Sequence, residues 1–399
     1  MSHPASPLRP GGLTPETELL TPDGLCSAED LCNTDRVYAL EPDSRLVKPK
    51  RVVAVESVTD VNEVVSVETR RADLRLAPTN PVYYCTDALP RPRVTLARDL
   101  PDKLEYKFLN RWQSPPGDRL TTIDLTDLTD RYQARVNYEG HGNAFLSRLP
   151  DGCDPIRGHS HSGYYFDAAT FKQFQEELES LGTTVEICGG SNSRGRPYRF
   201  DATDFFRLLG WFITEGLVYW SNTRRTAQVK IAQETPRYRR SLTRLFDRLG
   251  LSVSRSARDF RFGSTVFGEL FERLCGDTSG SKRLPWFTWT LCSGHQRVFL
   301  DTLMAGDGNN RGFFYTSSDT LAHDVLRLCL ELGTKPQYTR REEMWRISTN
   351  RVADGFRSDR NVQKAPYDGS FVRLTVEDYP AVLAGRNGNF QWVGVSKIA

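Results

Sequence analysis

Two apolar stretches of the chain end in the same way, with an acid followed by glycine. Segments 206–216 and 299–308 each have the spacing of a buried helix, in which apolar side chains recur every three or four positions. A glycine after the last helical residue is typical of a helix that ends through the left-handed conformation. We therefore predict two helices with Glu215 and Asp307 at their carboxyl ends, each followed by a left-handed glycine.

Small residues occupy matching positions in these two segments. They are Gly210 and Thr214 in the first segment, and Thr302 and Gly306 in the second. Residues four apart share one face of a helix, and small side chains on that face let a second helix backbone come close. The pattern predicts that the two helices cross and bring both acids to one seam. The alternative is two unrelated core helices, each ending in a glycine cap.

A pair of carboxylates at such a seam needs a compensating cation. The two charges repel each other, and each also opposes the dipole of its own helix. Magnesium takes oxygen ligands, and it can activate water for attack on a phosphodiester. The sequence thus predicts a Mg²⁺ site formed by Glu215 and Asp307, with Gly216 and Gly308 as further ligands, in a metal-dependent nuclease.

With these features, the two segments resemble the paired motifs of the LAGLIDADG (DOD-type) homing endonucleases. The resemblance implies an α+β fold with two pseudo-symmetric αββαββα halves and saddle-shaped β-ribbons, placed here at 201–278 and 279–352. It gives the two acids the metal-binding role in cleavage. It gives Gly210 and Thr302 the role of helix contacts across the interface between the halves.

The turn 279–285 between the two halves carries two cations. In this family a lysine in a comparable place helps to polarise the scissile phosphate or its water. The resemblance therefore implies a catalytic role for Lys282, and Arg283 could replace it electrostatically. A plain surface linker is the competing interpretation.

Basic residues follow each of the two segments. The whole chain has a formal net charge of +3, but 221–263 holds eleven Lys or Arg against three acids. Alternating patterns at 226–233 and 252–262, and three shorter ones between 312 and 349, predict strands with one polar face. Such basic ribbons suit the major groove of DNA, whereas a solvated charged face is the alternative. The predicted DNA-binding residues are Arg224, Arg225, Lys230, Arg255, Arg258, Arg261, Lys335, Arg340, Arg341 and Arg346.

The two ends of the chain resemble a different family, the intein splicing (Hint) domains. The similar blocks are 13–40, 64–86 and 374–394. The resemblance implies a mostly β horseshoe made from both chain ends, with 1–100 and 353–399 as its two parts. Residues 101–200 would then be a linker or a DNA-recognition insert, and an unrelated β-rich scaffold is the alternative for the ends.

Protein splicing needs particular nucleophiles and acids, and these are replaced here. The first position requires Cys or Ser, the second block requires Thr and His, and the last block requires His and a terminal Asn. The positions that should carry these groups hold Gly12, Ala77, Asn80, Pro380 or Tyr379, and Val395. We therefore predict that the Hint-like part is inactive in splicing.

The cysteines and the hydropathy of the chain say little about its function, but they bear on its redox state and location. Eight cysteines without a CxxC pair indicate reduced thiols, while Cys153, His159 and His161 have a spacing that could supply zinc ligands. No stretch approaches the roughly 20 apolar residues of a membrane span, and the amino terminus lacks the pattern of a signal peptide. We therefore expect an intracellular, cytoplasmic protein that does not enter a membrane.

Together these observations predict a monomeric, Mg²⁺-dependent, site-specific endonuclease. Its partner would be double-stranded DNA with an asymmetric target site, since the two basic ribbons differ in sequence. Two other classes remain open. One is a maturase-like protein that binds DNA or RNA without cutting it, and the other is a self-splicing intein.

Overall fold

The chain folds into two compact units. The computed structural model describes residues 11–86, 89–100, 105–159, 162–190, 193–350 and 355–398. One unit, called the β unit here, joins Met1–Gly117 to Gly308–Ala399, and the other, called the motif unit, is Asp118–Asp307. The boundary at Gly308 lies inside the segment 279–352, which the sequence assigns to a second nuclease-like half.

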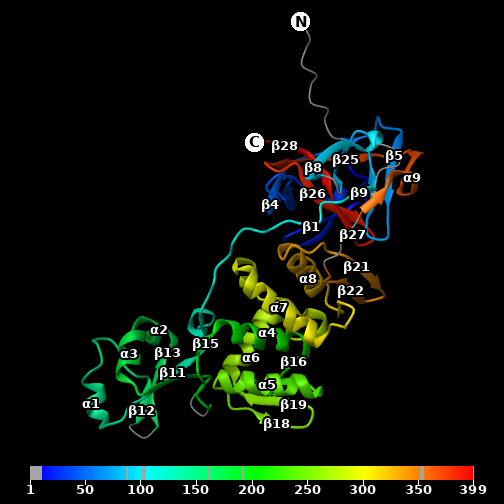
Figure 1. The fold of residues 1–399 in the computed structure, drawn as a ribbon. Helices are drawn as coiled ribbons and strands as arrows, with labels where there is room; N and C mark the ends of the chain where they lie inside the picture. The colour runs from blue at the N-terminus through cyan, green and yellow to red at the C-terminus, as the bar shows by residue number, and fades with distance from the viewer. Residues whose placement is uncertain are drawn as a thin grey trace. The chain divides into compact units, whose positions relative to one another are not determined.

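The β unit is built around a large sheet that uses strands from both ends of the chain. Its main path runs β23-β9-β7-β27-β26-β3-β4-β25-β28, with β1, β2 and β8 attached to it. Blue strands from the start of the chain lie beside red strands from its end, as in the pairing of β1 with β26 (Figure 1). Both chain ends thus contribute strands to one β-rich unit, whose parts, Met1–Gly117 and Gly308–Ala399, extend beyond the expected 1–100 and 353–399. The early strands are β1 (Glu18–Thr21), β2 (Gly24–Ser27), β3 (Arg36–Glu41), β4 (Leu46–Val58), β7 (Pro81–Thr86), β8 (Leu89–Leu96) and β9 (Glu105–Lys107). The late strands are β23 (Gly355–Arg357), β25 (Phe371–Glu377), β26 (Ala381–Arg386), β27 (Asn389–Gly394) and β28 (Ser396–Ile398).

Alternating side chains explain why these strands form a sheet with a buried face. In β25 the even positions from Val372 to Val376 point into the core, where they meet Val37, Val52 and Val382. Strand β26 is buried along almost its whole length, as expected for a strand covered on both faces. A smaller sheet completes the unit, in the order β24 (Val362–Pro366), β5 (Glu63–Glu68) and β6 (Asp73–Leu76), and α9 (Ser358–Asn361) precedes β24.

The β unit also holds most of the expected second half. This part consists of β20 (Phe313–Thr316), α8 (Asp319–Glu331), β21 (Tyr338–Arg341) and β22 (Met344–Ser348). Two hydrogen bonds join the end of α8 to residues from early in the chain. The Tyr38 hydroxyl donates to Glu331 over 2.7 Å, and the Trp112 indole donates to the Leu330 carbonyl over 2.8 Å. This ribbon is therefore anchored on the β unit.

The motif unit contains a complete αββαββα sequence of elements. They are α4 (Ala202–Glu215), β16 (Gly216–Trp220), β17 (Ala227–Ala232), α5 (Pro236–Arg248), β18 (Ser254–Arg255), β19 (Asp259–Gly263) and α6 (Thr265–Cys275). The strands form one antiparallel sheet in the order β16-β17-β19-β18. The element order expected for the first half is therefore present, although the predicted strand at 252–262 is divided into β18 and β19.

The second half is shorter than the symmetric scheme requires. Among the described residues it reads α7 (Ser293–Gly306), β20, α8, β21 and β22, with three strands in its sheet. Where the first half has strand β16, paired over five residues with β17, the second half has one isolated bridge between Gly308 and Phe314. The expectation of two complete αββαββα halves is therefore wrong for the described residues. Too few residues separate Gly308 from Phe314 for a longer hairpin.

Between the two ends of the chain lies a small module that comes before α4. Its four-stranded sheet has the order β12 (Arg157–His159), β13 (Gly163–Asp167), β11 (Gln133–Asn137) and β14 (Thr184–Cys188). The helices are α1 (Gly142–Leu146), α2 (Ala168–Gln173) and α3 (Gln175–Leu181), and a separate pair of strands is β10 (Thr122–Asp124) with β15 (Arg199–Asp201).

Within the described residues, no helix is both long and apolar enough to cross a bilayer.

Candidate nuclease site and candidate splice-site positions

The motif helices α4 and α7 meet through their small residues. A Cβ atom added at Gly210 would lie 2.8 Å from the Cβ of Thr302, and one added at Gly306 would lie 2.5 Å from the Cβ of Thr214. Each helix thus offers one glycine and one threonine, and each glycine faces the threonine of the other helix. Backbones that approach this closely leave no room for a larger side chain. The structure brings together all four residues that the sequence placed at the helix contact.

The amino end of α4 is fixed by two acids with different tasks. Asp201 is the N-cap, and its side chain accepts a hydrogen bond from the Asp204 amide over 2.9 Å. The Asp204 carboxylate instead accepts hydrogen bonds from Arg248 at 2.6 Å and Arg207 at 2.9 Å. The hydrogen bond from Arg248 is the largest of the contributions that hold the pKa of Asp204 below its usual value, and Arg207 acts in the same direction. The start of α4 is therefore tied to α5.

The helix ends differ from the predicted left-handed exits. Gly216 has φ −102° and ψ 148°, which is extended backbone, and Gly308 is absent from the positive-φ glycines of the described chain. The left-handed prediction is therefore wrong at both positions. Glycine is required at 216 for a different reason: an added Cβ would lie 2.6 Å from the Cα of Phe212. The close return of the chain over the last helical turn excludes a side chain there.

Lys282 closes the carboxyl end of α4. Its ammonium donates to the carbonyl of Phe212 over 3.0 Å and to that of Gly216 over 2.9 Å, and it lies 4.0 Å from the centre of the Phe212 ring. Only 5% of the residue is exposed, and burial lowers the pKa of Lys282 to about 8. The interpretation of Lys282 as part of a surface linker is therefore wrong. A cation at this position is stabilising, because it lies at the negative end of the helix dipole.

We expect Lys282→Met to destabilise the motif unit by about 1 to 3 kcal/mol, because the Gly216 carbonyl then loses the ammonium that donates to it in a buried place. Thermal unfolding followed by circular dichroism measures the change. Arg283→Met is the matched control, since Arg283 is its exposed neighbour. Equal unfolding temperatures for the two variants would contradict this role for Lys282.

Both candidate acids have raised pKa values, and the charge of Glu215 contributes to the shift of Asp307. Burial raises the pKa of Glu215. Burial, followed by the nearby charge of Glu215, raises the pKa of Asp307 to about 6, while Lys282 acts in the opposite direction. A pair of acids that resist ionisation together favours a bound cation. The structure thus places Glu215 and Asp307 close enough to interact, in one unit and at the carboxyl ends of crossing helices.

The residues around these acids set the limits for a metal ion. In the described parts of the chain, no group of three or more His, Cys, Asp or Glu side chains could hold one. The Gly216 carbonyl already accepts a hydrogen bond from the Lys282 ammonium. This positive charge would repel a metal ion bound to the same carbonyl. Two carboxylates remain as protein ligands. This number fits Mg²⁺, which often takes one or two carboxylates and completes its shell with water and substrate phosphate.

The basic side chains of the first ribbon are largely paired with acids. Arg261 makes two hydrogen bonds to Asp259, at 2.9 and 2.7 Å, and Lys230 lies 3.6 Å from the same carboxylate. These bonds, with Arg261 first, lower the pKa of Asp259 to about 2. Arg255 pairs with Asp247, and Arg258 pairs with Glu234. Asp259 was missed by the sequence analysis, although its position two residues before Arg261 places both on one face of β19.

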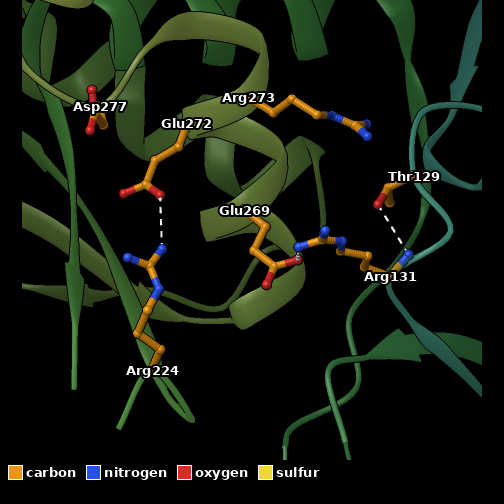
Figure 2. A pocket seen from close by; sticks show the side chains of 7 residues that line it. All are labelled: Thr129, Arg131, Arg224, Glu269, Glu272, Arg273 and Asp277. Carbon is orange, nitrogen blue, oxygen red and sulfur yellow. Dashed lines mark hydrogen bonds and ion pairs between the residues drawn. The ribbon is translucent and has the colours of Figure 1, made fainter. Parts of the chain in front are cut away.

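Arg224 and Arg225 lie in the turn between β16 and β17, and both are exposed. Arg224 stacks over Trp220 and forms an ion pair of 3.6 Å with Glu272. Figure 2 shows this pair at one side of a pocket of about 410 Å³, which also includes Arg131 and Glu269 at 3.7 Å. Opposite charges therefore alternate around this pocket, and neither candidate metal ligand lines it.

The cations of the second ribbon have different surroundings. Lys335 donates to the carbonyl of Arg71 over 2.7 Å, and Arg340 pairs with Asp319 at 3.1 Å. Arg346 stacks over the Phe313 ring at 4.0 Å, and Arg341 is exposed at the end of β21. The ten predicted DNA-binding residues are thus divided between ribbons in two units, with acids close to most of those in the first.

The five positions that the Hint resemblance assigns to splicing lie together in the β unit. Asn80 is buried, and its side chain accepts from the Gly12 amide over 3.2 Å and donates to the Gly394 carbonyl over 3.1 Å. The Ala77 amide donates to the Gly12 carbonyl, and the Val395 amide donates to the Pro380 carbonyl. The residues at which a splicing domain would act are therefore close in space, but none of the five carries a nucleophile or a proton donor of the kind required.

The zinc alternative rests on residues that the structure describes only in part. Cys153 is buried, and this burial is the main reason that the pKa of its thiol is raised to about 11. His159 lies at the end of β12, and His161 is outside the described residues. All eight cysteines are free thiols.

Comparisons with known proteins give partial similarity. No protein-family model matches the chain. A DNA polymerase of Thermococcus kodakarensis is 28% identical over 134 residues, which are 32% of this chain and 8% of the polymerase. The chain thus spans less than a tenth of the curated relative's length. Among solved structures, I-DmoI in complex with DNA and Mn is 16% identical to this chain. The match covers 37% of this chain and 88% of the I-DmoI chain, with a TM-score of 0.29. A variant of the AceL NrdHF class 3 split intein is 17% identical. The match covers 25% of this chain and 62% of the intein chain, with a TM-score of 0.23.

Proposed function

We propose that this protein is a site-specific DNA endonuclease of the LAGLIDADG (DOD-type) class that carries a Hint-like β unit without splicing activity. The main support is the crossing of α4 and α7, where the glycine of each helix faces the threonine of the other and both helices end in an acid. Acids kept at such a crossing, with raised pKa values, are costly for folding. Their cost is understandable if they bind a cation that carries out chemistry.

The proposed metal ligands are Glu215 and Asp307, with Mg²⁺ as the ion. A Mg²⁺ ion at this place would supply an activated water and would stabilise the leaving oxygen of a phosphodiester. The two carboxylates would hold the cation, while the small residues of the crossing keep the two helix ends close together. Lys282 is proposed as a positioning residue, since it fixes the last turn of α4 and lowers the pKa of Asp307 through its charge.

The proposed partner is double-stranded DNA. The first ribbon presents Lys230 and Arg261 on one face, where they are directly opposite each other on β17 and β19. The two ribbons differ in strand number and in their basic residues, so a single chain acting as a monomer would recognise an asymmetric site. Phosphate contacts from arginines would make binding weaken as salt increases.

Cleavage of a mixed DNA pool tests this function directly. Purified protein is incubated with Mg²⁺ and fragments of genomic DNA, and the new ends are sequenced. We expect one discrete cleavage site that disappears in EDTA. Binding without any new ends would favour the non-cleaving alternative. No binding to duplex DNA would reject the endonuclease and would leave only RNA binding for the non-cleaving protein.

The proposed loss of splicing gives a second prediction. Gly12→Cys restores a nucleophile at the first splicing position, but Gly12 has φ +108° and an added Cβ would lie 2.7 Å from the carbonyl oxygen of Val372. We expect this variant to be less stable than the wild type and to remain full length. Intact mass spectrometry after incubation with a thiol checks this result. Loss of the residues before position 12 would show that the step can still occur.

A further inference from the structure

A basic groove lies within the β unit, at the place where the second ribbon meets the turn 69–72 between β5 and β6. Its volume is about 250 Å³, and its lining includes Arg70 and Arg71 from this turn and Arg346 from β22. The amides of Gln337, Asn350 and Asn389 line it as well. The ribbon expected to bind DNA and the former splicing scaffold therefore form one continuous surface.

The turn 69–72 is held in place by its backbone. The Thr69 hydroxyl accepts from the amides of Arg71 at 3.0 Å and Ala72 at 2.9 Å. Lys335 and Gln337, which lie just before strand β21 of the ribbon, donate to the carbonyls of Arg71 and Arg70 at 2.7 and 3.4 Å. Because these bonds use backbone atoms, the two guanidinium groups are not needed to hold the turn.

The charge of this groove differs from that of the first ribbon. No acidic side chain lines it, and in the described parts of the chain none of Arg70, Arg71 and Arg346 forms an ion pair. In the first ribbon, by contrast, Arg255, Arg258 and Arg261 each have an acidic partner. Guanidinium groups bind phosphate through paired hydrogen bonds, and unneutralised ones retain their full charge for an external anion.

We propose that Arg70, Arg71 and Arg346 bind the phosphodiester backbone of duplex DNA, so that the β unit itself is part of the DNA-binding surface. This inference rests on the proposed function and extends it to residues that the splicing resemblance leaves without a role. The side-chain amides beside the arginines can donate to further phosphate oxygens. The β unit then has a reason to remain folded although its splicing chemistry is absent.

A charge-matched comparison tests the groove. Arg70→Ala/Arg71→Ala is compared with Arg36→Ala/Arg51→Ala, which removes two exposed, directly opposite arginines from β3 and β4 of the same unit. Binding to a fluorescein-labelled random-sequence duplex is measured by anisotropy over a range of salt concentrations, without metal. We expect the slope of log K against log salt to fall by about 2 for the groove variant, because each phosphate contact contributes about 0.9.

Equal slopes for the two double variants would overturn the proposal, as would a wild-type protein that binds no duplex. Arg70→Lys/Arg71→Lys keeps the charge and should retain most of the slope. Circular dichroism confirms that each variant is folded. Cleavage with Mg²⁺ is measured separately, so a protein that cuts DNA but shows equal slopes would reject the groove and leave the proposed endonuclease function intact.

Discussion

Replacing either candidate acid is expected to abolish DNA cleavage and, for Asp307, to make the protein more stable. Glu215→Gln and Asp307→Asn each remove a negative charge from the proposed metal site, and we expect at least about a hundredfold loss of the cleavage rate. Gel-based cleavage with Mg²⁺ measures this loss. Asp301→Asn changes an exposed acid of the same helix and should cleave at the wild-type rate.

The stability change follows from the raised pKa of Asp307. Since its pKa is about 6 in the folded chain and 3.8 without the fold, the unfolded chain loses this proton first as pH rises. Stability is therefore lost between about pH 4 and pH 6, and the full cost is present at pH 8. Asp307→Asn should remove a cost of about 1 to 2 kcal/mol, allowing for partial solvent exposure.

Thermal unfolding in EDTA at pH 5 and pH 8 measures this effect. We expect Asp307→Asn to unfold at a higher temperature than the wild type, with a larger difference at pH 8. Added Mg²⁺ should stabilise the wild type and not the variant, because a ligand that binds only the folded chain raises its stability. A variant that is less stable than Asp301→Asn at pH 8 would contradict the argument.

The helix crossing provides the second large effect. Alanine normally stabilises a helix interior by about 1 kcal/mol relative to glycine. Gly306→Ala should do the opposite and destabilise the motif unit by about 1 to 3 kcal/mol, because its Cβ would lie 2.5 Å from the Cβ of Thr214. Thermal or denaturant unfolding measures the change. Cleavage should fall with it, since Glu215 directly follows Thr214 and Asp307 directly follows Gly306.

Two further variants make this test specific. Gly294→Ala lies in the same helix, where an added Cβ would have only the Cys292 sulfur within 4 Å, at 3.8 Å, so we expect no loss of stability. Thr214→Gly/Gly306→Thr exchanges the two residues and should recover part of the stability lost in Gly306→Ala. Equal effects of Gly294→Ala and Gly306→Ala would show that the close approach at Gly306 is unimportant.

The local features of this chain could be predicted from sequence because they depend on spacing. The contacts of Gly210 with Thr302 and of Thr214 with Gly306 follow from residues four apart on two helices. The strand at 227–232 follows from alternation, which places Val229 and Ile231 in the core. The β unit from both chain ends was predicted from block resemblance.

Features that depend on distant partners could not be predicted in this way. The extended exit at Gly216 depends on Lys282, which is 66 residues away and takes the carbonyl that a helix end leaves unpaired. The reduction of the second half to three strands depends on the short chain between Gly308 and Phe314 and on the anchoring of α8 by Tyr38 and Trp112. Neither leaves a periodic signal in the sequence.

The bridge made by Asn80 has a consequence for how the β unit responds to its surroundings. A carboxamide can accept and donate at the same time, so one side chain joins the Gly12 amide to the Gly394 carbonyl without carrying a charge. A histidine at that position would change its hydrogen bonds on protonation near neutral pH. The hydrogen bonds that join the two chain ends through Asn80 are therefore insensitive to acidity, because the side chain that holds Gly12 beside Gly394 does not titrate.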